Sequence, residues 1–191
     1  MTMQNNDAKA RFPLQTAAGV RMLVLDVDGV LSDGRVTLMD SAEQIKSFNV
    51  RDGHGIKMLQ RAGIQVAILT GRRSLVVEHR AKELGIVHVI QGSLDKASGM
   101  TALCEAAAVA WSDCAYMGDD VVDLPAMRGC ALSTAPKDAH QGVLGAVDWV
   151  SSANGGQGAV RELAEGLILA SGQWSAVVEQ RYGLSPSACG W

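Results

Sequence analysis

The sequence predicts an α/β domain in which helices cover both faces of a doubly wound parallel sheet. Four short, largely apolar runs recur along the chain, a pattern typical of strands that are buried on both faces. Helix-like segments separate these runs, and neighbouring parallel strands need such crossover connections. The length of 191 residues fits one compact domain, and an apolar content of 48% is sufficient for its core.

The predicted strands end at polar residues or at glycine, as strands do where the chain turns toward a helix. In chain order the strands cover residues 22–25, 66–69, 87–90 and 114–117, with shorter candidates at 131–133 and 148–150. Most of these segments are too short for a buried helix, which favours the assignment as strands.

Capping residues and glycines mark the ends of the predicted helices. Gly63 and Gly85 are placed to end the first two, because glycine readily adopts the left-handed conformation that follows a helix. Ser74 and Asp95 are placed to begin the second and third by accepting hydrogen bonds from free backbone N–H groups. The predicted helices cover residues 56–62, 75–84, 96–108 and 159–170.

Residues 35–48 interrupt the alternation of strands and helices. Apolar residues flank the polar stretch 39–43, which favours a turn. We therefore expect a β-hairpin that projects from the sheet. The expected domain organisation is an N-terminal extension over 1–20, a domain over 21–171 and a tail over 172–191 whose last residues are loose.

The composition excludes several classes of protein. A net charge of −3 and an aromatic content of 4% argue against a partner made of nucleic acid, which calls for a basic surface. We expect no membrane insertion, because the chain has no run of 18 apolar residues and its first twenty residues lack the apolar segment of a secretory signal. The four cysteines show no metal-ligand spacing, and we expect free thiols and a cytoplasmic location.

Polar side chains stand at the ends of the predicted strands. In an open parallel sheet, ligands bind beyond the carboxyl ends of the strands. Clustered carboxylates suit a hard divalent cation such as Mg²⁺, and a hydroxyl and an ammonium group suit the oxygens of a phosphoryl group. The residues so placed are Asp26, Asp28, Thr70, Lys96, Asp119, Asp120 and Asp123.

Here the sequence resembles the haloacid dehalogenase superfamily of phosphatases. Residues 26–31 read D-V-D-G-V-L and match its first signature, D-x-D-G-[VT]-[LV]. Thr70-Gly71-Arg72, Lys96 and the stretch 118–123 (G-D-D-V-V-D) supply the second, third and fourth motifs in order. Over residues 21–170 the chain is similar to the family within it whose members hydrolyse the 8-phosphate of an eight-carbon sugar acid used in lipopolysaccharide synthesis.

The resemblance implies a role for each motif residue. Asp26 would attack phosphorus and form an aspartyl-phosphate, and Asp28 would act as general acid and then as general base. Mg²⁺ would be held by Asp26, by the backbone carbonyl of Asp28 and by Asp119. Thr70 and Lys96 would bind the phosphoryl oxygens.

A sugar-acid phosphate carries a carboxylate and hydroxyls, so arginine, lysine and backbone amides are expected beside it. The resemblance points to the following substrate-binding residues: Asn49, Val50, Arg51, Asp52, Gly53, Lys57, Arg72, Arg80 and Lys96. The spacing between the motifs leaves no room for a cap domain, so something outside the core must cover the site. The resemblance implies a homotetramer in which the hairpin and the C-terminal region help to close a neighbour's site.

Several alternatives stay open at this point. A phosphatase of a nine-carbon sugar-acid 9-phosphate would use the same core, and a phospho-acceptor signalling module also combines acids, a threonine and a lysine around Mg²⁺. Asp120 and Asp123 are better suited to supporting hydrogen bonds or helix capping than to direct metal ligation, which stays open as the second interpretation. Asp52 is equally suited to capping a helix, and His54 lies in the substrate loop without an assigned role.

Overall fold

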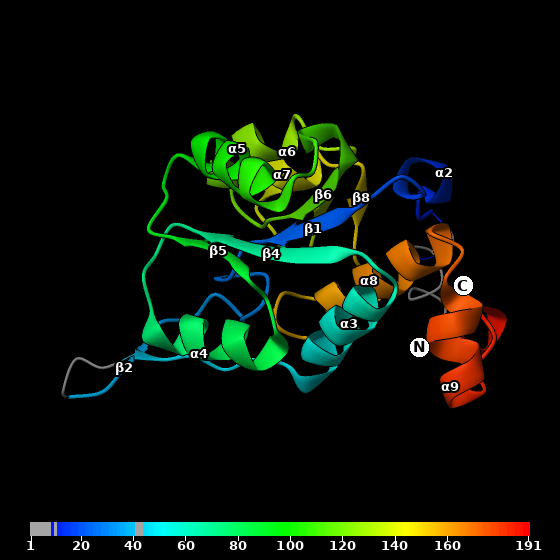
Figure 1. Cartoon of the computed structure of the whole chain (residues 1–191). Helices are drawn as coiled ribbons and strands as arrows, with labels where there is room; N and C mark the ends of the chain where they lie inside the picture. The colour runs from blue at the N-terminus through cyan, green and yellow to red at the C-terminus, as the bar shows by residue number, and fades with distance from the viewer. Residues whose placement is uncertain (1–8, 10, 41–43) are drawn as a thin grey trace.

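The computed structural model describes Lys9, residues 11–40 and residues 44–191. Within this part of the chain, six parallel strands form one sheet in the order β5-β4-β1-β6-β7-β8 (Figure 1). The strands are β1 (Met22–Leu25), β4 (Gln65–Thr70), β5 (His88–Gln91), β6 (Cys114–Met117), β7 (Leu132–Ala135) and β8 (Trp149–Val150). The predicted doubly wound parallel sheet is confirmed, including both of its shorter strands.

Helices pack on both faces of this sheet. One face carries α3 (Val50–Arg61), α4 (Leu75–Leu84) and α8 (Ala159–Ala170), and the other carries α5 (Lys96–Ala107), α6 (Leu124–Met127) and α7 (Gln141–Leu144) (Figure 1). The shorter helical segments are α2 (Leu14–Ala17), η1 (Trp111–Asp113), η2 (Val121–Asp123), η3 (Ser175–Glu179), α9 (Gln180–Tyr182) and η4 (Ser187–Cys189).

The central strand β1 contributes side chains to two separate cores. Leu23 and Leu25 pack in the cluster that includes α3, α4 and α8, whereas Met22 and Val24 pack in the cluster that includes α5. All four side chains are fully buried, which explains why the strand is apolar throughout. β1 pairs with β4 on one side and β6 on the other, so its carboxyl end lies at the point where the chain changes direction across the sheet.

Helix α3 begins at Val50, six residues before the start predicted from its apolar pattern. Asn49 caps it by accepting a hydrogen bond from the backbone N–H of Arg51 at 2.8 Å. Its first turns contain Gly53 and Gly55, which disfavour a helix in isolation. A Cβ at Gly55 would lie 3.1 Å from the Cα of Arg161 in α8, so the close packing of these helices favours a glycine there.

The predicted hairpin is present as a two-stranded antiparallel sheet, β2 (Thr37–Leu38) and β3 (Gln44–Ile45). It extends away from the body of the molecule (Figure 1). Four apolar residues are largely uncovered on its described part, with exposed fractions of 49% for Val36, 61% for Leu38, 51% for Met39 and 49% for Ile45. Residues 41–43 of the expected turn lie outside the described residues.

The C-terminal residues pack on the core, and the expectation of a loose tail is wrong. The Trp174 side chain is buried in the core cluster of α3 and α8. The ring of Trp191 lies edge-to-face against Phe12, with 5.6 Å between ring centroids, and Phe12 in turn contacts Trp149 at 5.2 Å. Burying these large aromatic surfaces holds the segment around Phe12 and the C-terminal residues together beside α8 (Figure 1).

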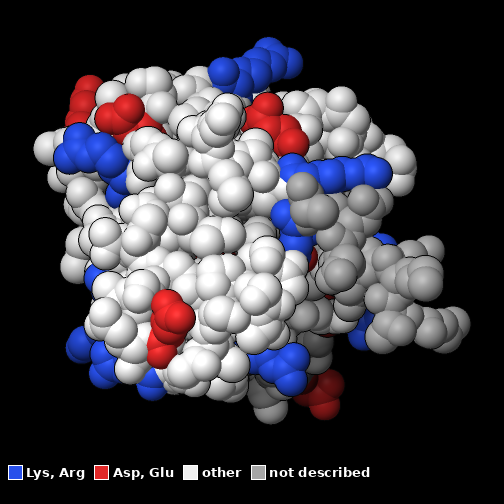
Figure 2. All heavy atoms as spheres, turned by 90° about the vertical axis from the view of Figure 1, so that its right-hand side faces the viewer, with Lys and Arg blue, Asp and Glu red and all other residues white. Residues whose placement is uncertain are grey.

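The surface carries charges of both signs. On the face shown in Figure 2, lysine, arginine and acidic side chains are scattered among uncharged residues, and the described atoms form no broad basic area. None of the helices in the described ranges combines the length and the apolar character needed to cross a bilayer.

Candidate active site

A pocket of about 280 Å³ opens beyond the carboxyl ends of β1, β4 and β6. Six of the residues predicted for catalysis, metal binding or substrate binding line it: Asp26, Asp28, Thr70, Arg72, Lys96 and Asp119. The rest of the lining comes from Gly34, Gly71, Leu94, Asp120 and Val122. The structure therefore brings the four sequence motifs together at one edge of the sheet.

Lys96 joins two carboxylates at the base of this pocket. Its Nζ lies 3.0 Å from Oδ1 of Asp26 and 2.9 Å from Oδ1 of Asp123, and it donates to the backbone carbonyl of Leu69 at 2.9 Å. Burial by itself would lower the pKa of this lysine, but the carboxylates of Asp26 and Asp123 raise it above its usual value. The two carboxylates thus favour the charged ammonium form of Lys96 in the protein interior.

Asp123 is fully buried, and hydrogen bonds occupy its carboxylate on all sides. Oδ1 accepts from the Tyr116 hydroxyl at 2.8 Å as well as from Lys96, and Oδ2 accepts from the backbone N–H groups of Asp119 and Asp120 at 3.2 and 3.4 Å. This agrees with the supporting role that was one of its two sequence interpretations. Asp120 caps η2 by accepting from the backbone N–H of Val121 at 2.7 Å.

Three carboxylates meet closely enough to share a cation. Oxygen atoms of Asp26, Asp119 and Asp123 lie within 4.8 Å of one another. Because the Asp123 oxygens are already occupied, Asp26 and Asp119 are the candidate ligands of this cluster. Oδ1 of Asp26 is buried and, apart from its ion pair with Lys96, has no hydrogen-bond partner among the described residues. Buried carboxylate oxygens that lack a full set of hydrogen-bond partners fit a hard divalent cation.

The charges of this cluster oppose one another without a cation. Burial and the neighbouring Asp123 carboxylate raise the pKa of Asp26 to about 6. Burial and the carboxylates of Asp26 and Asp123 raise the pKa of Asp119 to about 7. Gly29 leaves the space that Asp119 fills, because a Cβ at this position would overlap the Asp119 carboxylate. The arrangement is typical of a site completed by a metal ion.

Asp28 faces the same pocket but has different partners. Its Oδ1 forms an ion pair with Nζ of Lys46, and its Oδ2 lies 4.0 Å from Nε of Arg72. Thr70, which is buried at the end of β4, accepts a long hydrogen bond of 3.4 Å from the backbone N–H of Arg72. Sequence reasoning missed Lys46, because no motif marks a lysine on the hairpin.

The predicted substrate loop does not line this pocket. Val50 and Arg51 point toward solvent, and Asn49 caps α3. Asp52 is buried, and its carboxylate accepts from the backbone N–H groups of Gly158 at 3.2 Å and Arg161 at 2.8 Å. Asp52 therefore caps the start of α8 with both carboxylate oxygens, and its role in substrate binding stays a prediction.

The other predicted substrate residues also lie apart from the pocket. Gly53 is buried beside Arg80, whose guanidinium group pairs with Glu83 at 2.8 Å and lies over the ring of Phe48. Nζ of Lys57 lies near Gly85, at the end of α4 remote from Arg72. Within one chain, Arg72 and Lys96 remain as the predicted substrate-binding residues that reach the pocket.

The His54 side chain contacts residues of two other helices. Its Nδ1 lies 3.0 Å from Nη1 of Arg161 and its Nε2 lies 3.1 Å from the hydroxyl of Tyr182. Burial and the charges of Arg161 and Arg61 lower its pKa, which favours the neutral imidazole. His54 thereby links α3 to α8 and to the C-terminal α9.

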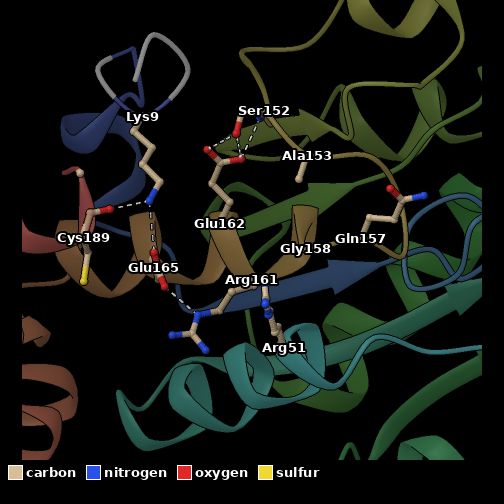
Figure 3. Close-up of a pocket in the computed structure, with 11 residues that line it drawn as sticks. Lys9, Arg51, Ser152, Ala153, Gln157, Gly158, Arg161, Glu162, Glu165 and Cys189 are labelled. Atoms are coloured by element: carbon tan, nitrogen blue, oxygen red, sulfur yellow. Dashed lines mark hydrogen bonds and ion pairs between the residues drawn. The ribbon is translucent and has the colours of Figure 1, made fainter. Parts of the chain in front are cut away.

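A second pocket, of about 620 Å³, lies beside the start of α8 (Figure 3). Its charged side chains mostly pair with one another: Glu165 accepts from Nε of Arg161 at 2.7 Å and lies 3.6 Å from Nζ of Lys9. Glu162 accepts from Ser152, as the dashed lines in Figure 3 mark. Of the residues 49–53, Arg51 lines this second pocket, and none of the five lines the acidic one.

Comparison with known proteins agrees with this geometry. The haloacid dehalogenase-like hydrolase family matches residues 52–130. A 3-deoxy-D-manno-octulosonate 8-phosphate phosphatase from Salmonella typhi is 46% identical over 157 residues, covering 82% of this chain and 84% of the relative. The chain belongs to this family of phosphatases.

Solved structures of the family have the same fold. The phosphatase from Moraxella catarrhalis, in complex with magnesium, phosphate and KDO, superimposes with a TM-score of 0.85 at 37% identity, covering 88% of this chain and 97% of that one. The cobalt-bound phosphatase from Haemophilus influenzae gives a TM-score of 0.84 at 42% identity, covering 89% and 100%.

Proposed function

We propose that this protein hydrolyses the 8-phosphate of 3-deoxy-D-manno-octulosonate to the free sugar acid and inorganic phosphate, a step in lipopolysaccharide biosynthesis. One observation carries the proposal. This chain belongs to the phosphatase family described above, and a single pocket in it is lined by Asp26, Asp28, Thr70, Lys96 and Asp119. The reaction is a phosphoric monoester hydrolysis, and Mg²⁺ is the cofactor.

Asp26 is the proposed nucleophile. One of its carboxylate oxygens attacks phosphorus, a bond forms between them, and the bond from phosphorus to the sugar oxygen breaks. Asp28 donates its proton to that leaving oxygen. Asp28 then takes a proton from water, and the resulting hydroxide attacks the aspartyl-phosphate to release phosphate and restore Asp26.

The remaining polar groups would bind the metal ion and the anionic groups of the substrate. Asp26, Asp119 and the backbone carbonyl of Asp28 would hold Mg²⁺, which when bound offsets the repulsion between an anionic nucleophile and an anionic substrate. Lys96 keeps Asp26 oriented through its 3.0 Å contact and, with the Thr70 hydroxyl, binds the phosphoryl oxygens. Arg72, at the mouth of the pocket, is the candidate for the sugar carboxylate.

The proposed assembly is a homotetramer. The exposed Val36, Leu38 and Ile45 of the hairpin favour burial against another subunit, since contiguous apolar surface is unfavourable in water. In such an assembly, the loop 49–53, Lys57 and Arg80 could contribute to the site of a neighbouring subunit, since they do not reach the pocket of their own chain. Light scattering should give a mass of about four chains, and Leu38→Glu should give a smaller species; a monomeric wild type with full activity would contradict the proposal.

The proposed location is the cytoplasm. Cys104 and Cys114 stay free although their Sγ atoms lie only 3.9 Å apart, and Cys130 and Cys189 are also free thiols. Unpaired cysteines at such short range suit a reducing compartment.

The deciding experiment measures phosphate release with and without Mg²⁺. The substrates are the 8-phosphate of the eight-carbon acid, a nine-carbon sugar-acid 9-phosphate and a hexose phosphate. We expect the first to be preferred and its hydrolysis to be lost without Mg²⁺ and in Asp26→Asn. Preference for the nine-carbon substrate would overturn the proposed substrate, and a stable aspartyl-phosphate without release would overturn the hydrolase.

A further inference from the structure

Lys46 is a buried cation supplied by the hairpin. It follows β3 directly, and its side chain is only 4% exposed. Arg35, on the other arm of the same hairpin, has a side chain that is 86% exposed and pairs with the nearby Asp33. Burying an ammonium group is unfavourable unless a specific partner compensates it, so the inward turn of Lys46 requires an explanation.

The partner of Lys46 is Asp28. Nζ of Lys46 and Oδ1 of Asp28 form both an ion pair and a hydrogen bond, across 18 residues of sequence. Asp26, two residues before Asp28, is instead paired with Lys96 from α5. The two carboxylates of the D-x-D motif therefore have separate cations, one from the core and one from the hairpin.

Lys46 reaches Asp28 from outside the pocket. It is absent from the described residues that line the acidic cavity, whereas Asp28 and Arg72 line it. The second oxygen of Asp28 lies 4.0 Å from Nε of Arg72, too far for a hydrogen bond. The close contact that restrains the Asp28 carboxylate is thus the one to Lys46, and it leaves the side of Asp28 that faces the pocket free.

We propose that Lys46 is a positioning residue that holds the Asp28 carboxyl group in line with the leaving-group oxygen of the substrate. The inference rests on the proposed function, in which Asp28 transfers a proton to that oxygen. A displacement of about 1 Å in a reacting group can reduce the rate of a step by about 10²-fold, so a group that fixes this carboxyl contributes to catalysis without touching the substrate.

The test compares two substrates that differ in their need for a proton. The sugar alcohol of the 8-phosphate leaves only when it is protonated, whereas p-nitrophenolate leaves unprotonated. The value of kcat/KM reports the steps up to and including the departure of this group. Lys46→Met and Lys46→Gln should therefore lower kcat/KM for the sugar-acid phosphate about tenfold or more and change that for p-nitrophenyl phosphate less than about twofold.

Two controls separate positioning from folding. Lys46→Arg keeps the cation and should restore kcat/KM for the sugar-acid phosphate to within about threefold of wild type, with the loss in the neutral variants confined to kcat. Arg35→Met removes an exposed cation from the same hairpin and should leave kcat and kcat/KM unchanged for both substrates. The rise in Tm on adding Mg²⁺ should be the same in all four variants, because no proposed metal ligand is altered.

Equal losses on both substrates would overturn the inference, since Lys46 would then act on folding or on phosphoryl transfer itself. Unchanged activity in both neutral variants would also overturn it. A wild type without phosphatase activity on either substrate would instead overturn the proposed function, and this inference with it.

Discussion

Lys96 lies 3.0 Å from the nucleophile candidate Asp26 and is only 2% exposed, so one buried ion pair serves both the fold and the site. Such a pair has little effect on stability while it is complete, because the loss of hydration roughly offsets the attraction. Removing one partner is different: the other charge is then left in the interior. The same lysine also contacts Asp123, so its removal would leave two carboxylates without a cation.

Lys96→Met should therefore destabilise the protein by about 3–5 kcal/mol and abolish phosphatase activity. Urea unfolding at pH 7.5 measures the first effect and phosphate release the second. Lys96 lowers the pKa of Asp26, which is about 6 with the lysine present, so in the variant Asp26 takes up a proton at a higher pH. The difference in stability should therefore shrink as the pH falls from about 8 toward 6. An equally large loss at pH 5.5 would contradict this explanation.

The stability of the metal-free protein should fall as the pH rises from about 4 to about 7. The pKa values of Asp26 and Asp119 are raised to about 6 and about 7, so the folded state binds more protons than the unfolded state across this range. Deprotonation builds up repulsion in the folded state. Mg²⁺ relieves that repulsion, and the rise in Tm that it causes should therefore be small at pH 5 and large at pH 8.

Asp119→Asn is the variant that tests this pH dependence of stability. The amide is close in shape to the carboxyl group but carries no charge, so the metal-free variant should be more stable than wild type at pH 8. Each kcal/mol of relieved repulsion corresponds to about 2–4 °C in Tm for a chain of this size. Mg²⁺ should no longer raise the Tm, and activity should be lost. A normal Mg²⁺ response would remove Asp119 from the metal site.

Gly29→Ala should impair metal binding, and Gly63→Ala provides its control. Both glycines adopt positive φ angles, +87° and +82°, so both substitutions cost about 1–2 kcal/mol in backbone strain. A Cβ at Gly29 would also overlap the Asp119 carboxylate, whereas nothing lies within 4 Å at Gly63. The Mg²⁺ concentration for half-maximal activity should rise in Gly29→Ala alone; an equal rise in both variants would contradict this placement of Asp119.

Asp52→Ala should affect stability and leave substrate affinity unchanged. Loss of its carboxylate removes the hydrogen bonds to the backbone N–H groups of Gly158 and Arg161, and a lost cap of this kind costs about 0.5–2 kcal/mol. Thermal unfolding and KM for the sugar-acid phosphate are the measurements. A large increase in KM at unchanged Tm would instead assign Asp52 to substrate binding.

Much of the fold could be predicted because local pattern and burial agree. The run 22–25 is apolar throughout since both faces of β1 are covered, and Gly85 ends α4 in the left-handed conformation that its position predicts. The start of α3 could not be predicted in this way. Gly53 and Gly55 weaken the local helix signal, and they are present because α3 packs closely against its neighbours, which local sequence does not record.

The sequence by itself determined which residues meet at the pocket. Asp26, Thr70 and Asp119 each follow or end a parallel strand, and the carboxyl ends of such strands lie along one edge of the sheet whatever the loops between them do. The side chains of a linear motif are thus gathered by the regular geometry of the sheet.

Only the tertiary structure decided the contacts that the sheet does not impose. Lys46 reaches Asp28 because the hairpin folds back on the pocket, and Asp52 caps a helix more than 100 residues further along the chain. Trp191 contacts Phe12 because the segment around Phe12 and the C-terminal residues both pack beside α8. The path of the whole chain and the burial of charged and aromatic side chains decide these contacts. Neither produces a periodic pattern or a motif spacing that could be recognised in the sequence.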